Sequence, residues 1–415
     1  MRALASALQH LTQLQHLPLA RSQLGNAGLA ALAPALSAIP GLQTLGVDNN
    51  LVSGTEGAKA LCMLLGTVPG LTHLDVSYCS LRNEGAALLA AVLRGLTCLQ
   101  TLDISSISIG DSGMVTVAPA LAALPHLHTL NVIHNQFGAG AVSMLQPVLA
   151  REGSPLRRLD LSFMELRVKG AQSLASGLST ATQLQELNLR NTAIGHHWQG
   201  WVALVPAFRR LEPSLQSLQL AFESLDNAGT GALATALETL TIPTCLRAAR
   251  VFTSAAMVIV SPVLMGMRWL QVLEMRYSIW GNEGTTAFVA VLPALSGSLK
   301  HLTLFAVELD AEAAANALAP ALAQAVGLVE LRCGCNGFGQ QGAQWLVPVL
   351  STLPHLRTVD LQCCKLRAHG CMAVARALKD RDGAAVYLAR NGVAHAQHST
   401  EGDELYTMPG INILL

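Results

Sequence analysis

Four cysteines lie close together near the C-terminal end of this 415-residue chain: Cys333, Cys335, Cys363 and Cys364. Thiolates are ligands that structural zinc ions prefer, and four of them can close a tetrahedral site. Two thiols held side by side can instead be oxidised to a disulfide. The spacing of these cysteines therefore suggests either a zinc site or a regulatory disulfide. Which of the two can form depends on how the backbone directs the four side chains.

Motifs for catalysis are missing from the rest of the sequence. The chain contains no Gly-rich phosphate-binding loop, no His-Glu-x-x-His and no Gly-x-Ser-x-Gly. His196 with His197, and His395 with His398, form pairs without cysteine or carboxylate support, which favours solvated side chains over metal ligands. We therefore predict that the protein is not an enzyme and has no cofactor.

The pattern Leu-x-x-Leu-x-Leu recurs at a nearly constant interval along almost the whole chain. In the repeat that begins at Leu71, Leu74 and Val76 alternate as in a strand with one buried face. The following Ala- and Leu-rich stretch has helical spacing. A strand and a helix in every repeat predict that neighbouring strands are parallel. The repeats begin at Leu14, Leu42, Leu71, Leu99, Leu127, Leu156, Leu184, Leu215, Leu246, Leu270, Leu299, Leu328, Leu356 and Gly383.

Polar residues and prolines mark the ends of the predicted helices. A short polar side chain at equivalent places could cap the helix that begins there. Prolines two residues before the next strand, such as Pro69 and Pro125, are expected to end the helices. The predicted caps are Asn26, Asn83, Asp111, Asn227 and Asn282, each followed two residues later by glycine.

The repeat length changes in the middle of the chain. The repeats that begin at Leu184 and Leu215 are longer than the others, and the repeat that begins at Leu246 is shorter, which predicts irregular curvature there. Residues 1–13 are predicted to form the helix of an incomplete repeat or cap, or to mark a chain cut from a longer protein. Residues 14–393 are predicted to form about thirteen repeats plus a terminal strand, and residues 394–415 a C-terminal tail or cap.

This pattern resembles the ribonuclease-inhibitor-like class of leucine-rich repeats over roughly residues 14 to 393. The resemblance implies an α/β horseshoe solenoid with parallel strands on the concave face and helices on the convex face. Asparagine or cysteine stands at the class's position after the strand in Asn50, Cys79, Asn135, Asn336, Cys364 and Asn391. Looser hydrogen bonding is expected where that position holds Ile107, Met164, Thr192, Glu223, Ser254, Ser278 or Val307.

The repeat pattern predicts how the four cysteine side chains are oriented. Strand alternation turns Cys333 into the core, and Cys364 takes the asparagine position, so only Cys335 and Cys363 remain side by side. The zinc site is therefore disfavoured, and packing is the favoured role of these residues.

Side chains at the fifth position of each repeat are expected to point to the concave face, about 4.8 Å from the next repeat. This ladder is mildly acidic in its first half and mixed in its second. Its members are Asp75, Asp103, Asn131, Asp160, Asn188, Gln219, Arg250, Glu274, Thr303, Arg332 and Asp360.

Aromatic residues are scarce, yet most Phe and Tyr fall on positions predicted to be exposed near this ladder. Four of them, in consecutive repeats and with charged neighbours, have the composition of an interface hot spot. The alternative, for Phe163 and Phe222 individually, is that the side chain turns toward the core and merely packs. The predicted partner-binding residues are Phe222, Arg250, Phe252, Glu274, Arg276, Tyr277 and Phe305.

Composition bounds the possible partners. The 26 basic and 26 acidic residues leave no positive excess, so we predict neither nucleic-acid binding nor membrane insertion. No apolar run reaches the roughly 20 residues of a membrane-spanning helix. Nine cysteines, an odd number, do not suggest a disulfide framework and favour a reducing compartment. We predict a cytoplasmic protein, with the nucleus, cytoskeleton or cilium as alternatives.

The favoured function is that of a protein-interaction scaffold or adaptor binding a protein partner on the concave face. The chain also resembles the Ran GTPase-activating protein in repeat type and length, which implies GTPase activation with a small GTPase as partner. That family's acidic tail is missing, since the C-terminal stretch has only Glu401, Asp403 and Glu404. A third alternative is the sensor part of a nucleotide-binding leucine-rich-repeat receptor, or a piece of a ciliary or cytoskeletal assembly.

Overall fold

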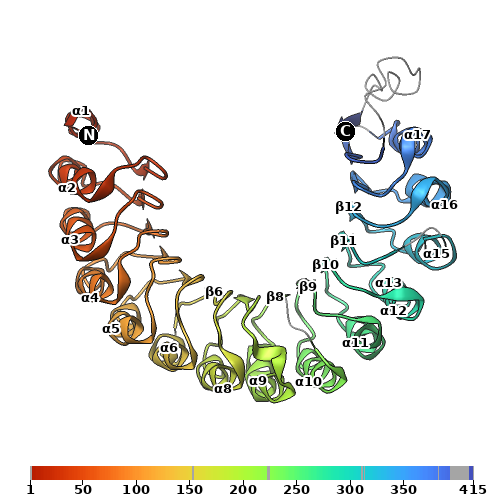
Figure 1. Ribbon diagram of the computed structural model, residues 1–415, viewed down its shortest axis with the longest axis horizontal. Coiled ribbons are helices and arrows are strands. Elements are labelled where there is room, and N and C mark those ends of the chain that lie inside the picture. The colour runs from red at the N-terminus through yellow and green to blue at the C-terminus, as the bar shows by residue number, and fades with distance from the viewer. Residues whose placement is uncertain are drawn as a thin grey trace. The chain divides into compact units, whose positions relative to one another are not determined.

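The computed structural model describes residues 2–151, 154–221, 225–309, 312, 314–381, 383–392 and 411–414. The chain divides into two compact parts, Met1–Leu215 (the N-terminal half) and Gln216–Leu415 (the C-terminal half). In each half, strands line the inner side of an arc and helices cover its outer side (Figure 1). The predicted α/β solenoid of parallel strands and helices is therefore confirmed within each half.

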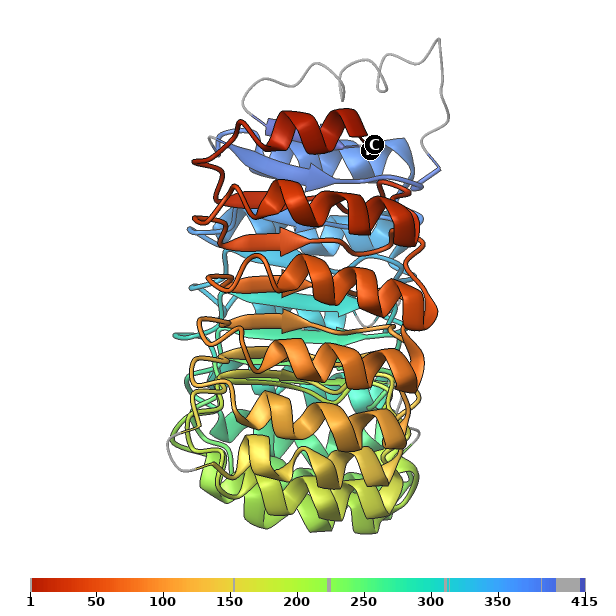
Figure 2. The same ribbon diagram turned by 90° about the vertical axis from the view of Figure 1, so that its left-hand side faces the viewer.

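The N-terminal half has seven short strands in its described residues, β1–β7, paired in parallel with their neighbours in chain order. Figure 2 shows its helices stacked as a row in front of these strands. The strands are β1 His16–Pro18, β2 Thr44–Gly46, β3 His73–Asp75, β4 Thr101–Asp103, β5 Thr129–Asn131, β6 Arg158–Asp160 and β7 Glu186–Asn188. The helices are α1 Arg2–Leu8, α2 Gly25–Leu36, α3 Gly54–Leu65, α4 Arg82–Leu93, α5 Asp111–Ala122, α6 Ala139–Met144, α7 Gln146–Leu149, α8 Arg167–Leu178, the 3-10 helix η1 Ile194–His196 and α9 Trp198–Leu211.

The C-terminal half continues the same alternation, again with each strand parallel to the next. Its strands are β8 Ser217–Ala221, β9 Cys245–Ala249, β10 Val272–Arg276, β11 His301–Phe305, β12 Glu330–Arg332, β13 Thr358–Asp360, β14 Ala384–Tyr387 and β15 Ile411–Leu414. Its helices include α10 Asn227–Glu238, α11 Ser254–Gly266, α12 Gly281–Val289, α13 Val291–Ala294, the π-helix η2 Ala314–Leu318, α15 Ala319–Leu322, α16 Gly339–Thr352 and α17 Arg367–Leu378.

The core of each half is a stack of leucines in phase. Leu45 pairs with Leu17 on one side and with Leu74 on the other, and all three side chains are buried. Each leucine therefore packs on its counterpart in the next repeat, and the residues between the leucines of a strand point to the opposite face.

The register of β9 differs from the prediction. Leu246 pairs with Leu218 and with Leu273, which are fourth-position leucines, so this repeat begins at Pro243 and not at Leu246. The expected shortening of this repeat and the expected lengthening of the repeat that begins at Leu215 were both wrong, because Pro243 lies almost midway between the repeat starts at Leu215 and Leu270. Proline and alanine at leucine positions had hidden the pattern. Consequently Arg247 takes the fifth position, not Arg250, and Val251 takes the asparagine position, not Ser254.

Buried asparagines tie neighbouring repeats together beneath the strands. The Asn50 amide donates to the carbonyls of Leu19 (2.6 Å) and Val47 (3.1 Å) and accepts from the Ser22 N–H (2.8 Å). Asn135, Asn336 and Asn391 form equivalent sets of bonds. These side chains satisfy backbone groups that would otherwise be buried without partners.

Three of the five predicted helix caps act differently from expectation, because their side chains reach forward to the next repeat. The Asn83 Oδ1 accepts from the Gly110 N–H (2.9 Å), and the Asp111 Oδ1 accepts from the Gly138 N–H (2.8 Å). A Cβ on Gly113 would lie 2.6 Å from the Asn83 Oδ1, which explains the glycine there. We call these forward-reaching side chains, Asn26, Asn83 and Asp111, the staples. Side-chain caps do form on α10, where Asp226 and not the predicted Asn227 provides the cap, and on α11, where Thr253 provides it.

The two ends of the described chain extend the solenoid. Helix α1 packs on α2, and β15 pairs with β14. Of the predicted tail, residues 394–410 and 415, with His395 and His398 among them, lie outside the described residues. None of the helices described is both long and apolar enough to cross a membrane.

Candidate protein-binding surface

Three neighbouring strands of the C-terminal half, β9, β10 and β11, form the candidate surface. Each has five residues, whereas each strand of the N-terminal half has three. The longer strands hold side chains at the third, fifth and seventh positions of adjacent repeats in one regular array. Regular backbone pairing fixes the spacing of these side chains, which favours a preorganised surface.

A carboxylate between two arginines lies at the centre of this array. Glu274 accepts from Arg247 Nε on β9 at 2.8 Å, and from Arg276 on its own strand at 3.1 Å. The Glu274 side chain is only 18% exposed, while those of Arg247 and Arg276 are 41% and 35% exposed. Such pairs contribute little stability at a surface. Their main effect is to hold both guanidinium groups in fixed orientations.

A second carboxylate, Glu330 on β12, repeats this arrangement. It accepts hydrogen bonds from His301 (2.9 Å) and Arg332 (2.6 Å). Burial raises the pKa of Glu330, but the bonds from His301 and Arg332 outweigh burial, so the pKa of this carboxyl is lowered. With Arg247, Arg250, Arg276 and Arg332 beside two glutamates, β9 to β12 carry more positive than negative charge.

Aromatic residues lie beside the arginines. The rings of Tyr277 and Phe305 meet edge to face with centroids 5.4 Å apart, and the Arg250 guanidinium lies 5.6 Å from the Tyr277 centroid. Tyr277 is 47% exposed. Phe305 lies over Gly334, where a Cβ would come within 3.0 Å of the ring. The glycine therefore gives the Phe305 ring room to lie across the neighbouring repeat.

The turn after each strand directs the residues at the eighth position. Arg250 and Tyr277 both have positive φ, at 56° and 54°, and so do their counterparts in the neighbouring repeats, Ala306 and Cys335. This left-handed conformation costs free energy for residues other than glycine. Its recurrence shows that the repeat imposes it, and it carries the Arg250 and Tyr277 side chains to the same edge of the surface.

Five of the predicted partner-binding residues lie together, but two do not support the prediction. Phe252 is 2% exposed, so its assignment to the surface was wrong. With the repeat beginning at Pro243, Phe252 follows the asparagine position and packs in the core. Phe222 lies outside the described residues. Arg247 was missed, although aligning Leu246 with Leu218 and Leu273 would have found it. We define the basic–aromatic surface as Arg247, Arg250, Glu274, Arg276, Tyr277 and Phe305.

The cysteine cluster has the predicted arrangement. Cys333 and Cys364 are buried, and the Cys364 thiol donates to the Cys333 carbonyl at 3.2 Å. Cys335 and Cys363 are neighbours, and burial together with its hydrogen bond to Cys363 raises the pKa of the Cys335 thiol. Within the described part of the chain, no three His, Cys, Asp or Glu side chains are grouped so that they could hold a metal ion.

The inner side of the N-terminal half is acidic. Asp103 and Asp160 each accept a hydrogen bond from the asparagine of the next strand, at 2.7 and 2.8 Å. Burial raises the pKa of Asp48 and of Asp103, and the charge of Asp75 raises both further. The predicted fifth-position ladder is therefore present here, and its carboxylates repel one another.

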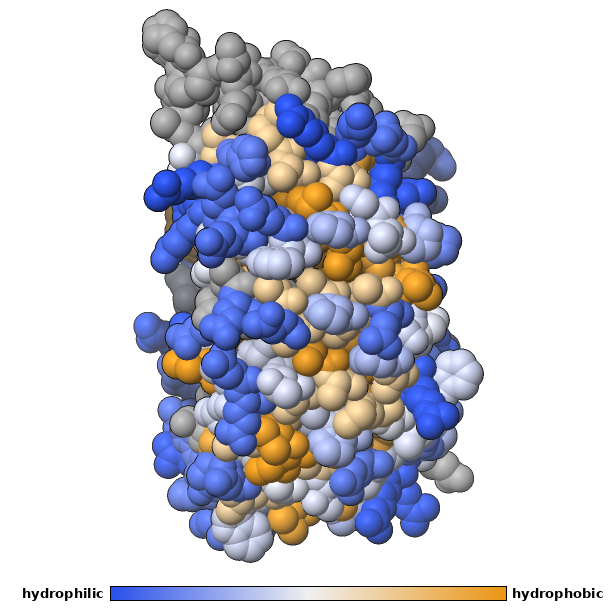
Figure 3. All heavy atoms as spheres, turned by 90° about the vertical axis from the view of Figure 1, so that its right-hand side faces the viewer, coloured by the Kyte–Doolittle hydropathy of each residue, from blue (hydrophilic) through white to orange (hydrophobic). Residues whose placement is uncertain are grey.

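The helical side of the C-terminal half carries exposed apolar residues. Figure 3 shows apolar side chains in a band between polar ones on this side. Val258, Val326 and Trp345 are exposed large apolar residues of this half, and a cavity of about 420 Å³ is lined by Val347, Met372 and Ala373 among others.

Comparison with known proteins agrees with the repeat geometry. A family model described as leucine-rich repeat matches residues 71–90, 95–118 and 352–375. This chain is a leucine-rich-repeat protein. It is 29% identical over 240 residues to the ribonuclease inhibitor of Sus scrofa, an alignment that covers 56% of this chain and 51% of the inhibitor. The repeats are thus ribonuclease-inhibitor-like, and the aligned part spans about half the length of that curated relative.

Two solved structures are also similar to this leucine-rich-repeat protein. An internalin (inlF) from Listeria monocytogenes has a TM-score of 0.42 and 15% identity, over 86% of this chain and 88% of the internalin. A TLR13–ssRNA13 complex has a TM-score of 0.47 and 19% identity, over 86% of this chain and 44% of the matched chain.

Proposed function

We propose that this leucine-rich-repeat protein is an interaction scaffold that binds a protein partner on the basic–aromatic surface of its C-terminal half. The observation that carries the proposal is the arrangement around Glu274. Two arginines are bonded there to one carboxylate, next to the ring pair of the half-exposed Tyr277 and the partly buried Phe305. Tyrosine and arginine are the residue types that most often dominate the free energy of protein–protein binding.

The rigidity of the surface supports this role. The arginines are already oriented and the rings already packed, so binding would cost less side-chain entropy than on a surface of free arginines. A partner would cover Tyr277 and Phe305 with an apolar side chain and place carboxylates against the arginines. The similarity to a ribonuclease inhibitor, whose name describes a protein acting on another protein, also favours a binding role.

Affinity purification with the full chain, followed by identification of the bound protein, provides the partner for the test. Tyr277→Ala should then weaken binding about 30-fold, because a central aromatic contributes about 2 kcal/mol or more. Arg276→Ala should weaken it by a similar factor. Tyr78→Ala is the matched control, since Tyr78 occupies the same position of a repeat in the other half and is 58% exposed.

The control should change the dissociation constant less than two-fold. If the wild type, Tyr277→Ala and Arg276→Ala bind the partner with equal affinity, the basic–aromatic surface is not the binding site. Activation of a small GTPase stays a prediction, and GTP hydrolysis by a panel of small GTPases with and without the protein tests it.

A further inference from the structure

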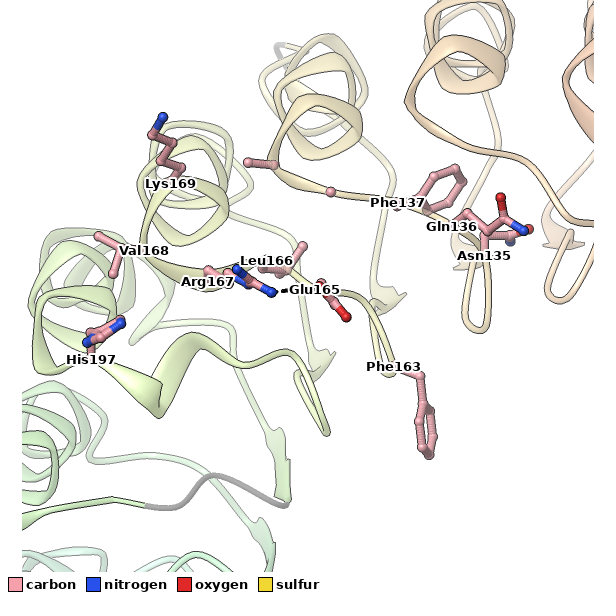
Figure 4. A pocket seen from close by; sticks show the side chains of 12 residues that line it. Asn135, Gln136, Phe137, Phe163, Glu165, Leu166, Arg167, Val168, Lys169 and His197 are labelled. Carbon is pink, nitrogen blue, oxygen red and sulfur yellow. Dashed lines mark hydrogen bonds and ion pairs between the residues drawn. The ribbon is translucent and has the colours of Figure 1, made fainter.

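A groove opens in the N-terminal half where the loops after β5, β6 and β7 meet the helices. Its volume is about 900 Å³, within the range of pockets that bury small ligands or several side chains. Residues 135–139 line it on one side and residues 165–169 on the other, and His197 lies beyond Val168 (Figure 4).

The groove lies at a repeat where a staple is missing. In the preceding repeats, Asn83 and Asp111 reach forward and bond to the start of the next helix. Ala139 stands at the equivalent position of the next repeat, between Gly138 and Gly140, and it has no polar group that could cross to α8. Small residues here therefore leave space that a polar side chain fills in the two preceding repeats.

The local charge also changes at this repeat. Arg82 and Glu84 begin helix α4, whereas Arg167 and Lys169 occupy the same places on α8, so a basic residue replaces an acidic one. Among the residues that line the groove, Glu165 is the carboxylate, and it pairs with Arg167 at 3.0 Å. Lys169 adds a second basic side chain (Figure 4), so Arg167 and Lys169 outnumber the carboxylate and the lining carries a positive excess.

Apolar groups complete the groove and its rim. Phe137 and Leu166 are 3% and 1% exposed and contribute to the lining. Phe163 is 40% exposed, stacks on His134 with ring centroids 4.1 Å apart, and extends away from the helices in Figure 4. Trp198, next to His197 in the chain, is 46% exposed. A ligand here would meet basic groups together with the exposed ring of Phe163.

We propose that this groove binds an acidic linear segment of a partner protein. Carboxylates of the segment pair with Arg167 and Lys169, and an aromatic or aliphatic side chain packs against the apolar lining and Phe163. Charge complementarity selects an acidic segment over a basic or neutral one. The groove belongs to the N-terminal half, and its residues are different from those of the basic–aromatic surface in the C-terminal half.

The test uses a phage-displayed library of random dodecapeptides selected on the full chain. Peptides that also bind the Ala139→Trp variant are removed, because tryptophan at this position would fill the groove without changing its charge. The remaining peptides should be enriched in Asp and Glu around an aromatic or aliphatic residue. Absence of such peptides, or enrichment without acidic residues, would overturn the proposal.

Charge reversal then separates the groove from a general electrostatic effect. Lys169→Glu and Arg167→Glu should each weaken binding of a selected peptide at least 10-fold. Arg82→Glu, the same change at the equivalent exposed position of an earlier repeat, should weaken it less than two-fold. Equal losses in all three variants would show that net charge alone attracts the peptide, and would also overturn the proposal. Circular dichroism verifies that each variant is folded.

Discussion

Replacing Asn336 by leucine removes a buried amide that joins two repeats of the C-terminal half. Its nitrogen donates to the carbonyls of Leu304 (2.7 Å) and Cys333 (2.8 Å). Its oxygen accepts from the N–H groups of Val307 (3.1 Å) and Leu309 (3.2 Å). Leucine has nearly the same shape but no polar atoms, so Asn336→Leu leaves these backbone groups without their partner in a site that is 3% exposed.

The expected loss in the free energy of unfolding follows from the two N–H groups that lose their acceptor. A buried donor without a partner costs about 1–3 kcal/mol. Two of them, with partial relaxation of the turn, should lower the free energy of unfolding by about 3–5 kcal/mol. Asn336→Cys should cost less, because the thiol of Cys364 at the equivalent position still donates to a backbone carbonyl.

Urea unfolding followed by circular dichroism measures these free energies, and amide hydrogen exchange at Val307 and Leu309 localises the change. Asn282→Leu is the matched control, because Asn282 is an exposed asparagine at the start of α12, and it should change the free energy of unfolding by less than about 0.5 kcal/mol. A loss below about 1 kcal/mol for Asn336→Leu, or a loss equal to that of the control, would refute the reasoning.

Two further predictions concern the N-terminal half. Asn83→Ala removes the staple to the Gly110 N–H and should lower the free energy of unfolding by about 1 kcal/mol, measured by urea unfolding. Asp75→Asn should lower the pKa of both Asp48 and Asp103, whose pKa is raised by burial and then by the charge of Asp75, as carboxyl NMR titration would show. Because these pKa values are raised in the folded state, ionisation of the two groups lowers stability as the pH rises through their titration range. The variant should therefore be more stable than the wild type at neutral pH, and the gain should disappear below about pH 3.

The sequence predicts much of this fold because the leucines repeat in phase. Leu45, Leu74 and Leu102 are regularly spaced, and their pairing in the sheet follows directly from that spacing. The prediction failed at β9, where Pro243 and Ala248 occupy leucine positions and Leu246 imitates the first leucine of a repeat. The register of β9 is fixed only by its pairing with β8 and β10. The error in register led to the wrong prediction that Phe252 is exposed.

Contacts between repeats were harder to predict than the repeats themselves. Asn83 stands near the start of its own helix, so its sequence position suggested a cap, but its partner belongs to the next repeat. Local sequence does not reveal such a partner. The groove beside Ala139 was missed for the same reason, because the absence of a polar side chain has meaning only once the staples are known.

The strand at Ile411–Leu414 was also not predicted as a strand. Its four residues follow no repeat pattern, and they form a strand by pairing with β14.

Photo-crosslinking tests most directly whether the basic–aromatic surface contacts the partner. Benzoylphenylalanine is introduced at position 277 in one variant and at position 78 in another, each replacing a tyrosine at the same place of its repeat. With the purified partner bound, we predict a crosslink from position 277 and none from position 78. A crosslink from position 78 in the absence of one from position 277 would contradict the account.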